Sequence, residues 1–131
     1  MAAAEGRYAN APVWPIALYD SLKRHSEMFP GLPIIVVENG CVTAADGIDR
    51  SHYLTQHLQE VQRAVADGMP IEAYLCWSIT SNREWGLPFD RNSDFGLFYI
   101  DLDRDPSLSR VVTDAAKTYA SIIESRSAVE E

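Results

Sequence analysis

Apolar residues recur at helical spacing in three parts of the chain. The pattern predicts helices from about Ile16 to Met28, from about Arg50 to Asp67 and from about Ser109 to Glu124. In the middle helix, Asp49 is placed to cap the first turn and Gly68 to end the last one. The apolar faces expected for the three helices contain Ile16, Tyr19 and Leu22, then Leu54, Leu58, Val61 and Val65, and finally Val112, Ala116, Tyr119 and Ile123.

Two continuous apolar runs predict β-strands. The first, Ile34-Ile35-Val36-Val37, shows no alternation with polar residues, which is typical of a strand buried on both faces, as in parallel sheets. The second runs from Ile71 to Trp77. A loop over residues 78–93 follows it, and then a short extended segment from Phe95 to Asp101.

The order strand, long helix, strand is a βαβ unit, and its right-handed crossover makes the two strands parallel. With the flanking helices, the chain reads as an α/β protein that contains two consecutive β/α units and the helix before them. Such units build either an open α/β sheet or a (β/α)₈ barrel. Neither G-x-G-x-x-G nor G-x-x-x-x-G-K occurs, so no nucleotide-binding motif favours the open sheet.

Composition narrows the function classes. The chain has 131 residues, 47% of them hydrophobic, and a net charge of −8. This charge disfavours nucleic acid and anionic membrane surfaces as partners, because both require clustered Lys and Arg. The isolated Cys41 and Cys76 are interpreted as small structural residues in a reducing compartment, in preference to metal ligands or nucleophiles. No cofactor or metal is expected, and a cytoplasmic protein is the default because the first residues lack a secretory pattern.

Both predicted strands end in residues that could carry chemistry. Glu38 follows the first strand and Trp77 ends the second, and the carboxyl ends of neighbouring barrel strands face one mouth. The plain alternatives are that Glu38 turns into solvent at the strand end, that Trp77 packs in the core, and that Glu84 pairs on the surface with Arg83. Against these, aromatic faces stack on sugar rings and a carboxylate such as Glu84 accepts hydrogen bonds from adjacent hydroxyls. Trp77, Glu84 and Trp85 therefore form a plausible sugar-binding set.

Four segments, taken in order, carry a more specific pattern: Val36-Val37-Glu38-Asn39-Gly40, then Asp46-Gly47-Ile48-Asp49-Arg50 with Tyr53-Leu54 and His57-Leu58, then Trp77-Ser78 with Asn82-Arg83-Glu84-Trp85, and finally Phe95-Gly96-Leu97 with Tyr99-Ile100-Asp101. They resemble I/V-T-E-N-G, D…D-x-x-R-x-x-Y-L-x-x-H-L, W-S-L-x-D-N-F-E-W and R-F-G-L-x-Y-V-D of the family 1 glycoside hydrolases. The resemblance covers about Pro12 to Glu124. Together the motifs favour the barrel and the functional interpretation of these residues.

The resemblance implies a retaining β-glycosidase, similar to β-glucosidases, that works with two carboxyl groups about 5–5.5 Å apart. Glu38 matches the nucleophile that forms the glycosyl-enzyme. Trp77 matches the platform under the sugar, and Glu84 the acid that grips its hydroxyls. Trp85 matches a hydrogen-bonding neighbour of those hydroxyls, and Phe95 the aromatic lining of the same subsite. Asn39, which follows the nucleophile, is interpreted as structural.

Several positions depart from the family pattern. Val37 stands where Thr is common, Ser81 replaces the usual Asp, and Asp94 replaces the usual Arg before Phe-Gly-Leu. Leu87-Pro88-Phe89 occupies a slightly long loop where the family has a glycine-aromatic turn. These changes are expected to border the substrate hydroxyls, so they bear on sugar preference more than on reaction type.

The chain is short for a barrel of roughly 200 residues or more. Residues 1–131 are therefore expected to form one partial domain, the last two β/α units with the preceding helix, and residues 1–11 and 125–131 are expected to be flexible tails. The acid/base motif T-x-N-E-P is absent, and neither Glu72 nor Asp101 is placed to replace it. By itself the chain is expected to be inactive, and to need either a complementary N-terminal barrel chain or self-association.

Two other functions remain open at this point. One is a non-catalytic, saccharide-binding remnant that keeps Trp77, Glu84 and Trp85 without turnover. The other is a different barrel glycosidase whose nucleophile also ends a late strand, an alternative that the Glu84-Trp85 pair disfavours.

Overall fold

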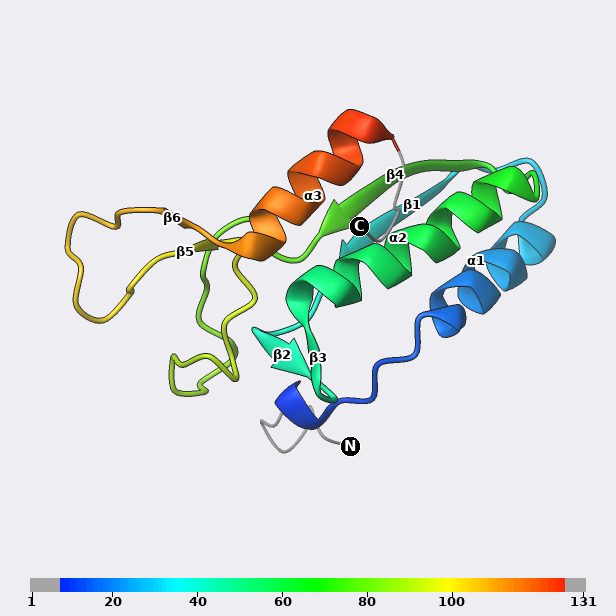
Figure 1. The fold of residues 1–131 in the computed structure, drawn as a ribbon. Helices are drawn as coiled ribbons and strands as arrows, with labels where there is room; N and C mark the ends of the chain where they lie inside the picture. The colour runs from blue at the N-terminus through cyan, green and yellow to red at the C-terminus, as the bar shows by residue number, and fades with distance from the viewer. Residues whose placement is uncertain (1–7, 127–131) are drawn as a thin grey trace.

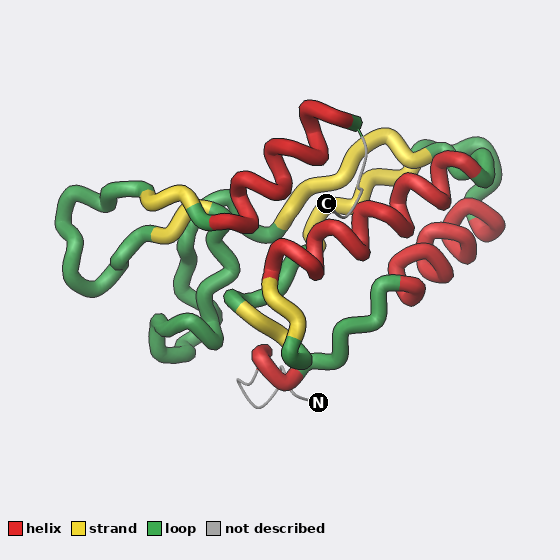
Figure 2. The backbone as a smooth tube through the Cα atoms, in the orientation of Figure 1, coloured by secondary structure: helices red, strands yellow, loops and turns green. Residues whose placement is uncertain are grey.

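The computed structural model describes residues 8–126. Its helices are α1 (Ile16–Met28), α2 (Arg50–Ala66) and α3 (Asp114–Ser125), with a short 3-10 helix, η2 (Tyr8–Asn10). Its long strands are β1 (Ile34–Asn39) and β4 (Ile71–Cys76), and its short strands are β2 (Ala44–Ala45), β3 (Ile48–Asp49), β5 (Phe98–Tyr99) and β6 (Val111–Val112). Figures 1 and 2 show the three helices lying along the β1–β4 pair.

The strands β1 and β4 are parallel and joined through α2, which confirms the predicted βαβ unit. Asp49 caps α2 as expected, because its side chain accepts a hydrogen bond from the backbone N–H of His52 at 3.0 Å. Gly68 follows the end of α2 with a φ of +86°, a left-handed conformation that suits glycine. The helix and both strands therefore begin and end within two residues of their predicted bounds.

Helix α3 begins five residues later than predicted, at Asp114 instead of Ser109. Residues 111 and 112 pair with β5 in an antiparallel ladder, which takes them out of the helix. The hydroxyl of Thr113 then caps α3 by accepting a hydrogen bond from the N–H of Ala116 at 3.2 Å. The predicted apolar face is also corrected, because Ile122 is buried while Ile123 is 59% exposed.

The core lies between the helices and one face of the β1–β4 pair. Side chains from α1, β1 and α2 meet there, and the buried members of this cluster are Tyr19, Leu22, Val36, Val61 and Ala64. A second cluster joins α2 to α3 through Leu54, Ala115 and Ala116. Val65, which was expected on the apolar face of α2, is 51% exposed and lies outside these clusters.

The expectation that β1 is buried on both faces is wrong for the described residues. Alternation along β1 and β4 sends Ile35, Val37 and Leu75 to the face opposite the helices, and these side chains are 50%, 66% and 52% exposed. We call these three residues the open face. No helix or strand among residues 8–126 covers the open face. The unbroken apolar run of β1 therefore includes side chains that this part of the chain leaves exposed.

The extended segment predicted from Phe95 to Asp101 is regular only at Phe98–Tyr99. At the N-terminal end, Tyr8–Asn10 lie within the predicted tail but form η2, and the Tyr8 ring packs edge-on against Phe95 with centroids 5.2 Å apart. Likewise Ser125 still belongs to α3. The rest of the predicted tails, apart from residues 11 and 126, lies outside the described residues. None of the described helices combines the length and the apolar character needed to cross a bilayer.

Candidate functional site

The carboxyl ends of β1 and β4 lie side by side. The backbone N–H of Trp77 donates to the carbonyl oxygen of Asn39 at 2.9 Å, so the ladder extends to the last residue of β1. Gly40 is required at this point, because a Cβ there would lie 1.8 Å from the carbonyl oxygen of Trp77. Since the strands are parallel, Glu38 and Trp77 come to the same edge of the sheet.

An irregularity in β1 determines where Glu38 points. The register shifts between Val36 and Asn39, as in a β-bulge. Consecutive residues of a regular strand point to opposite faces, yet Val37 and Glu38 are both exposed. No side chain among residues 8–126 forms a hydrogen bond or an ion pair with the Glu38 carboxylate. The strand therefore presents Glu38 at its end as an accessible acid.

Asn39 is held from two elements. The phenol of Tyr74 in β4 donates to the side-chain oxygen of Asn39 at 2.7 Å, and Tyr53 in α2 hydrogen-bonds to the same side chain. Burial raises the pKa of Tyr53 to about 12 and also raises the pKa of Tyr74 above its usual range, so both phenols stay protonated near neutral pH. These bonds support the structural interpretation of Asn39, directly beside Glu38.

Glu84 is joined to Trp77 instead of lying free on the surface. The residue is 7% exposed, and its carboxylate oxygen Oε1 accepts hydrogen bonds from the indole Nε1–H of Trp77 at 3.3 Å and from the side-chain amide of Asn82. The hydroxyl of Ser78 donates to the amide oxygen of Asn82 at 3.2 Å, which orients that amide. The alternative in which Glu84 pairs with Arg83 is wrong, because Arg83 forms its ion pair with Asp103.

The other predicted site residues are not brought into this group. Trp85 is 94% exposed. The Phe95 ring packs against Tyr8 and a cluster that includes Cys41, Val42 and Tyr53. Their roles beside a sugar stay predictions.

Two of the residues that depart from the family pattern, Ser81 and Asp94, are buried and accept hydrogen bonds from backbone N–H groups after β4. Ser81 is 7% exposed, and its hydroxyl oxygen accepts a hydrogen bond from the N–H of Ile100 at 3.0 Å. Asp94 is 4% exposed and accepts from the N–H of Gly96 at 2.9 Å. Both side chains are thus engaged by backbone N–H groups of the loop, and the expectation that these positions border substrate hydroxyls stays a prediction.

Asn82, Tyr53, Tyr74 and Arg50 are contributors to this site that sequence reasoning did not single out. Asn82, Arg50 and Tyr53 fall within the quoted motifs, which is the signal that could have drawn attention to them. Arg50 is 5% exposed although it begins a helix, and its guanidinium donates to backbone carbonyl oxygens of Cys41, Asp94 and Gly96. The partners of Tyr53, Tyr74 and Arg50 are distant in sequence, whereas Asn82 bonds to Glu84, two residues away.

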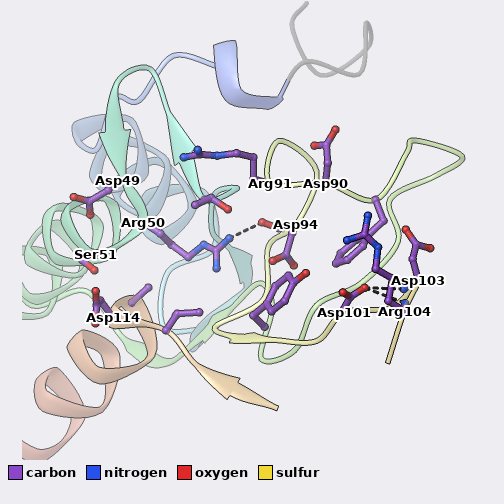
Figure 3. A pocket seen from close by; sticks show the side chains of 15 residues that line it. Asp49, Arg50, Ser51, Asp90, Arg91, Asp94, Asp101, Asp103, Arg104 and Asp114 are labelled. Atoms are coloured by element: carbon purple, nitrogen blue, oxygen red, sulfur yellow. Dashed lines mark hydrogen bonds between the residues drawn. The ribbon is translucent and has the colours of Figure 1, made fainter. Parts of the chain in front are cut away.

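A cavity of about 760 Å³ lies elsewhere (Figure 3). It is enclosed by the first turns of α2 and α3 and by loops around residues 89–94 and 99–104. Six aspartates and three arginines line it, but none of the predicted site residues does. Because the chemistry argued above belongs to Glu38, Trp77 and Glu84, we place the candidate site at the sheet edge and not in this cavity.

No group of three or more His, Cys, Asp or Glu side chains in the described range is arranged to hold a metal ion. The two cysteines are free thiols in this range. Burial raises the pKa of Cys41 to about 12 and that of Cys76 to about 11, so neither is a ready thiolate at neutral pH. The groups available for chemistry at the sheet edge are therefore carboxylates and indoles.

Comparison with known proteins gives a consistent result. The family model described as glycosyl hydrolase family 1 matches residues 4–128. The chain is 35% identical over 126 residues to a bifunctional β-D-glucosidase/β-D-fucosidase of Bifidobacterium breve, covering 87% of this chain and 26% of that protein. It is 39% identical over 88 residues to a β-galactosidase of Sulfolobus acidocaldarius, covering 67% of this chain and 17% of that protein.

Solved structures agree with this result. The β-glycosidase of Thermosphaera aggregans superposes with a TM-score of 0.75 at 31% identity, over 88% of this chain and 22% of that one. A family 1 β-glucosidase of Thermotoga maritima gives a TM-score of 0.74 at 25% identity, over 90% and 27% of the two chains. The described elements are therefore late β/α units of a (β/α)₈ barrel, as predicted, and the chain spans about a quarter of the length of these relatives.

Proposed function

Because the chain belongs to glycosyl hydrolase family 1, we propose that it forms part of a retaining β-glycosidase that cleaves O-glycosidic bonds through a glycosyl-enzyme on Glu38. One observation carries the proposal: an accessible carboxylate and the hydrogen-bonded Trp77–Glu84 pair lie at the carboxyl ends of adjacent parallel strands. The names of the relatives, a β-D-glucosidase/β-D-fucosidase and a β-galactosidase, support β-linked glycosides as the substrate class.

In the proposed first step, the Glu38 carboxylate attacks the anomeric carbon and the bond from that carbon to the leaving oxygen breaks. A proton reaches the leaving oxygen from an acid outside this chain. In the second step, the same outside group, now a base, takes a proton from water. The water oxygen bonds to the anomeric carbon while the bond from that carbon to Glu38 breaks, which releases the sugar and restores the Glu38 carboxylate. The group outside this chain acts first as acid and then as base, so the protons balance between the two steps.

The neighbouring residues would bind and orient the sugar. The Trp77 ring would form the platform under the ring, since its N–H is already engaged by Glu84. Both donors to Glu84 end on Oε1, which leaves Oε2 for sugar hydroxyls. Trp85 would reach the same hydroxyls from its exposed position, and Phe95 would support the subsite wall.

The rest of the barrel would come from outside these 131 residues, whether as another part of a longer protein, as a separate chain or by self-association. The open face and the free edges of β1 and β4 support this proposal, because apolar strands of an isolated pair need covering. The chain alone would then be an incomplete and inactive glycosidase. Cytoplasmic location stays a prediction from the sequence.

A second candidate is a saccharide-binding protein without turnover. The Trp77–Asn82–Glu84 group favours it, because this group is formed by residues 77–84 alone. The two candidates differ at Glu38. Binding without turnover predicts that Glu38→Gln leaves saccharide affinity unchanged and that no complement makes the chain active.

The test supplies the N-terminal part of a family 1 barrel, by co-expression or as a fusion, and measures hydrolysis of an aryl β-glucoside. We expect activity only when both parts are present, and a loss of about a thousandfold or more in Glu38→Gln. Glu72→Gln is the matched control, since Glu72 is an exposed acid near the start of β4 and should retain full activity. Equal activity in the two variants would refute the proposal.

A further inference from the structure

We infer that Arg50 is a positioning residue that fixes the loop bearing Trp77 and Glu84 relative to the strand bearing Glu38. Its relevance to catalysis rests on the proposed function, but the positional inference itself does not. Arg50 is the first residue of α2 and lies inside the protein, 5% exposed. Figure 3 shows its side chain directed toward Asp94.

The guanidinium joins two segments that are distant in sequence. On one side, Nε donates to the carbonyl oxygen of Cys41 at 3.0 Å, three residues after Glu38. On the other side, the two terminal nitrogens donate to the carbonyl oxygens of Gly96 and Asp94. All three acceptors are backbone atoms, so Arg50 holds the course of the main chain rather than the rotamer of a neighbouring side chain.

The second segment is connected directly to Trp77. The N–H of Ser78 donates to the carbonyl oxygen of Phe95 at 3.2 Å, and the N–H of Leu97 donates to the carbonyl oxygen of Ser78 at 2.8 Å. Gly96 is pressed against this stretch, because a Cβ there would lie 2.2 Å from the backbone nitrogen of Ser81. Displacing residues 94–96 would therefore move Ser78 and its neighbour Trp77.

The hydrogen-bond ladder between β1 and β4 does not by itself fix the position of Trp77 relative to Glu38. Its register shifts between Val36 and Asn39, where Glu38 lies. After this shift, the backbone hydrogen bond from Trp77 to Asn39 is formed, and both chain segments then continue as loops. Arg50 adds a rigid planar link at this point, since a guanidinium presents several donors in fixed directions and a lysine ammonium does not.

The charge environment supports a fixed guanidinium. Burial lowers the pKa of Arg50, and the nearby Asp94 carboxylate opposes that shift. An arginine remains protonated in proteins at all ordinary pH values, so its donors stay available. Asp94, which stands where the family usually has Arg, thus supplies a buried negative charge beside the guanidinium.

The experiment uses the full chain and no turnover. The indole N–H signals of the three tryptophans in ¹⁵N-labelled protein are assigned with single Trp→Phe variants, and Arg50→Lys is compared with wild type. We expect the Trp77 indole signal to move and the amide exchange of Ser78 and Leu97 to accelerate by about tenfold or more. The Trp14 signal should stay in place. Arg63→Lys, at a more exposed arginine of the same helix, is the matched control.

A variant that only loses thermal stability, with the Trp77 signal and the two amides unchanged, overturns the inference. If Arg50→Lys does not fold, a measurement on wild type decides. The Nε–H of Arg50 should then exchange with water at least about tenfold more slowly than that of Arg63, because it is buried and bonded to Cys41. Equal exchange rates of the two arginines would show that the link does not exist.

Discussion

Glu84 illustrates how single residues prepare this site. A carboxylate that is nearly enclosed by protein keeps its charge at acceptable cost when donors are directed at it. The Trp77 indole and the Asn82 amide supply those donors, and Ser78 orients the amide in turn. The carboxylate is therefore oriented within residues 8–126, before any sugar or partner is considered.

We predict that Asn82→Ala weakens substrate binding in the completed enzyme about tenfold. The reason is the loss of one hydrogen bond to a charged group, which contributes about 1.5–3 kcal/mol. The measurement is KM for an aryl β-glucoside, with kcat followed in parallel. Asn92→Ala, at an exposed asparagine of the neighbouring loop, serves as the control. Equal KM values in the two variants would show that Asn82 does not orient Glu84.

A second prediction at this scale concerns pH. Burial raises the pKa of Cys41 from 9.0 to about 12 and that of Cys76 to about 11. The unfolded chain loses these protons at lower pH, so stability that is present below about pH 9 is lost as the pH rises toward 11–12. The urea midpoint should fall between about pH 8 and pH 10.5, and it should fall less in Cys41→Ala. A midpoint that stays level over this range contradicts the buried placement.

The elements bring Glu38 and Trp77 together through close contact of two strand ends. Gly40 makes that contact possible, since the Trp77 carbonyl oxygen occupies the place of a side chain. The irregular register of β1 then turns Glu38 to the accessible side. Strand pairing and a small residue thus decide the position of the proposed nucleophile.

We predict that Gly40→Ala lowers the free energy of unfolding by roughly 2 kcal/mol or more, because a methyl group would overlap the Trp77 carbonyl oxygen. Urea unfolding measures this change. Gly31→Ala is the control, since Gly31 has a φ of +80° and open space around it, and it should cost only about 1–2 kcal/mol. An equal or smaller loss at Gly40 would mean that the strand ends lie further apart.

The long elements could be predicted from sequence because their own residues determine them. Leu54 to Val61 repeat at helical spacing, Asp49 caps the helix, and Gly68 ends it. The start of α3 could not be predicted, because residues 111 and 112 join β5 through a contact that local pattern does not contain. The open face of β1 was missed for a similar reason, since an apolar run does not reveal whether its second neighbour is present.

The same reasoning applies to the site. The strand-end position drew attention to Glu38 and Trp77, and the motifs added Glu84. The links made by Asn82, Tyr53, Tyr74 and Arg50 depend on which segments meet in space. Asn82 donates to Glu84, only two positions away. The meaning of that bond becomes clear only in the structure, because the Trp77 indole donates to the same Glu84 oxygen.

At the scale of the whole molecule, residues 8–126 cover the sheet on one side only. The helices lie along one face of β1 and β4 (Figure 1). The open face presents the exposed side chains of Ile35, Val37 and Leu75. Contiguous exposed apolar surface marks an interaction site in most proteins. In a completed barrel, this face would turn toward the other strands.

We predict that the isolated chain self-associates or binds the dye ANS, and that Val37→Lys reduces both by more than about half. Sedimentation velocity and ANS fluorescence are the measurements. Val65→Lys is the matched control, because Val65 is 51% exposed on the outer side of α2 and should leave both readouts unchanged. A wild-type chain that is monomeric and does not bind ANS would contradict the prediction.

The most direct test of the central claim is covalent trapping with a 2-deoxy-2-fluoro β-glucoside in the presence of the complementary barrel part. Its fluorine slows the release of the sugar, so the glycosyl-enzyme accumulates and can be located by peptide mass spectrometry. We predict one added sugar on the peptide that contains Glu38. A sugar attached to any other residue, with Glu38 unmodified, would contradict the account.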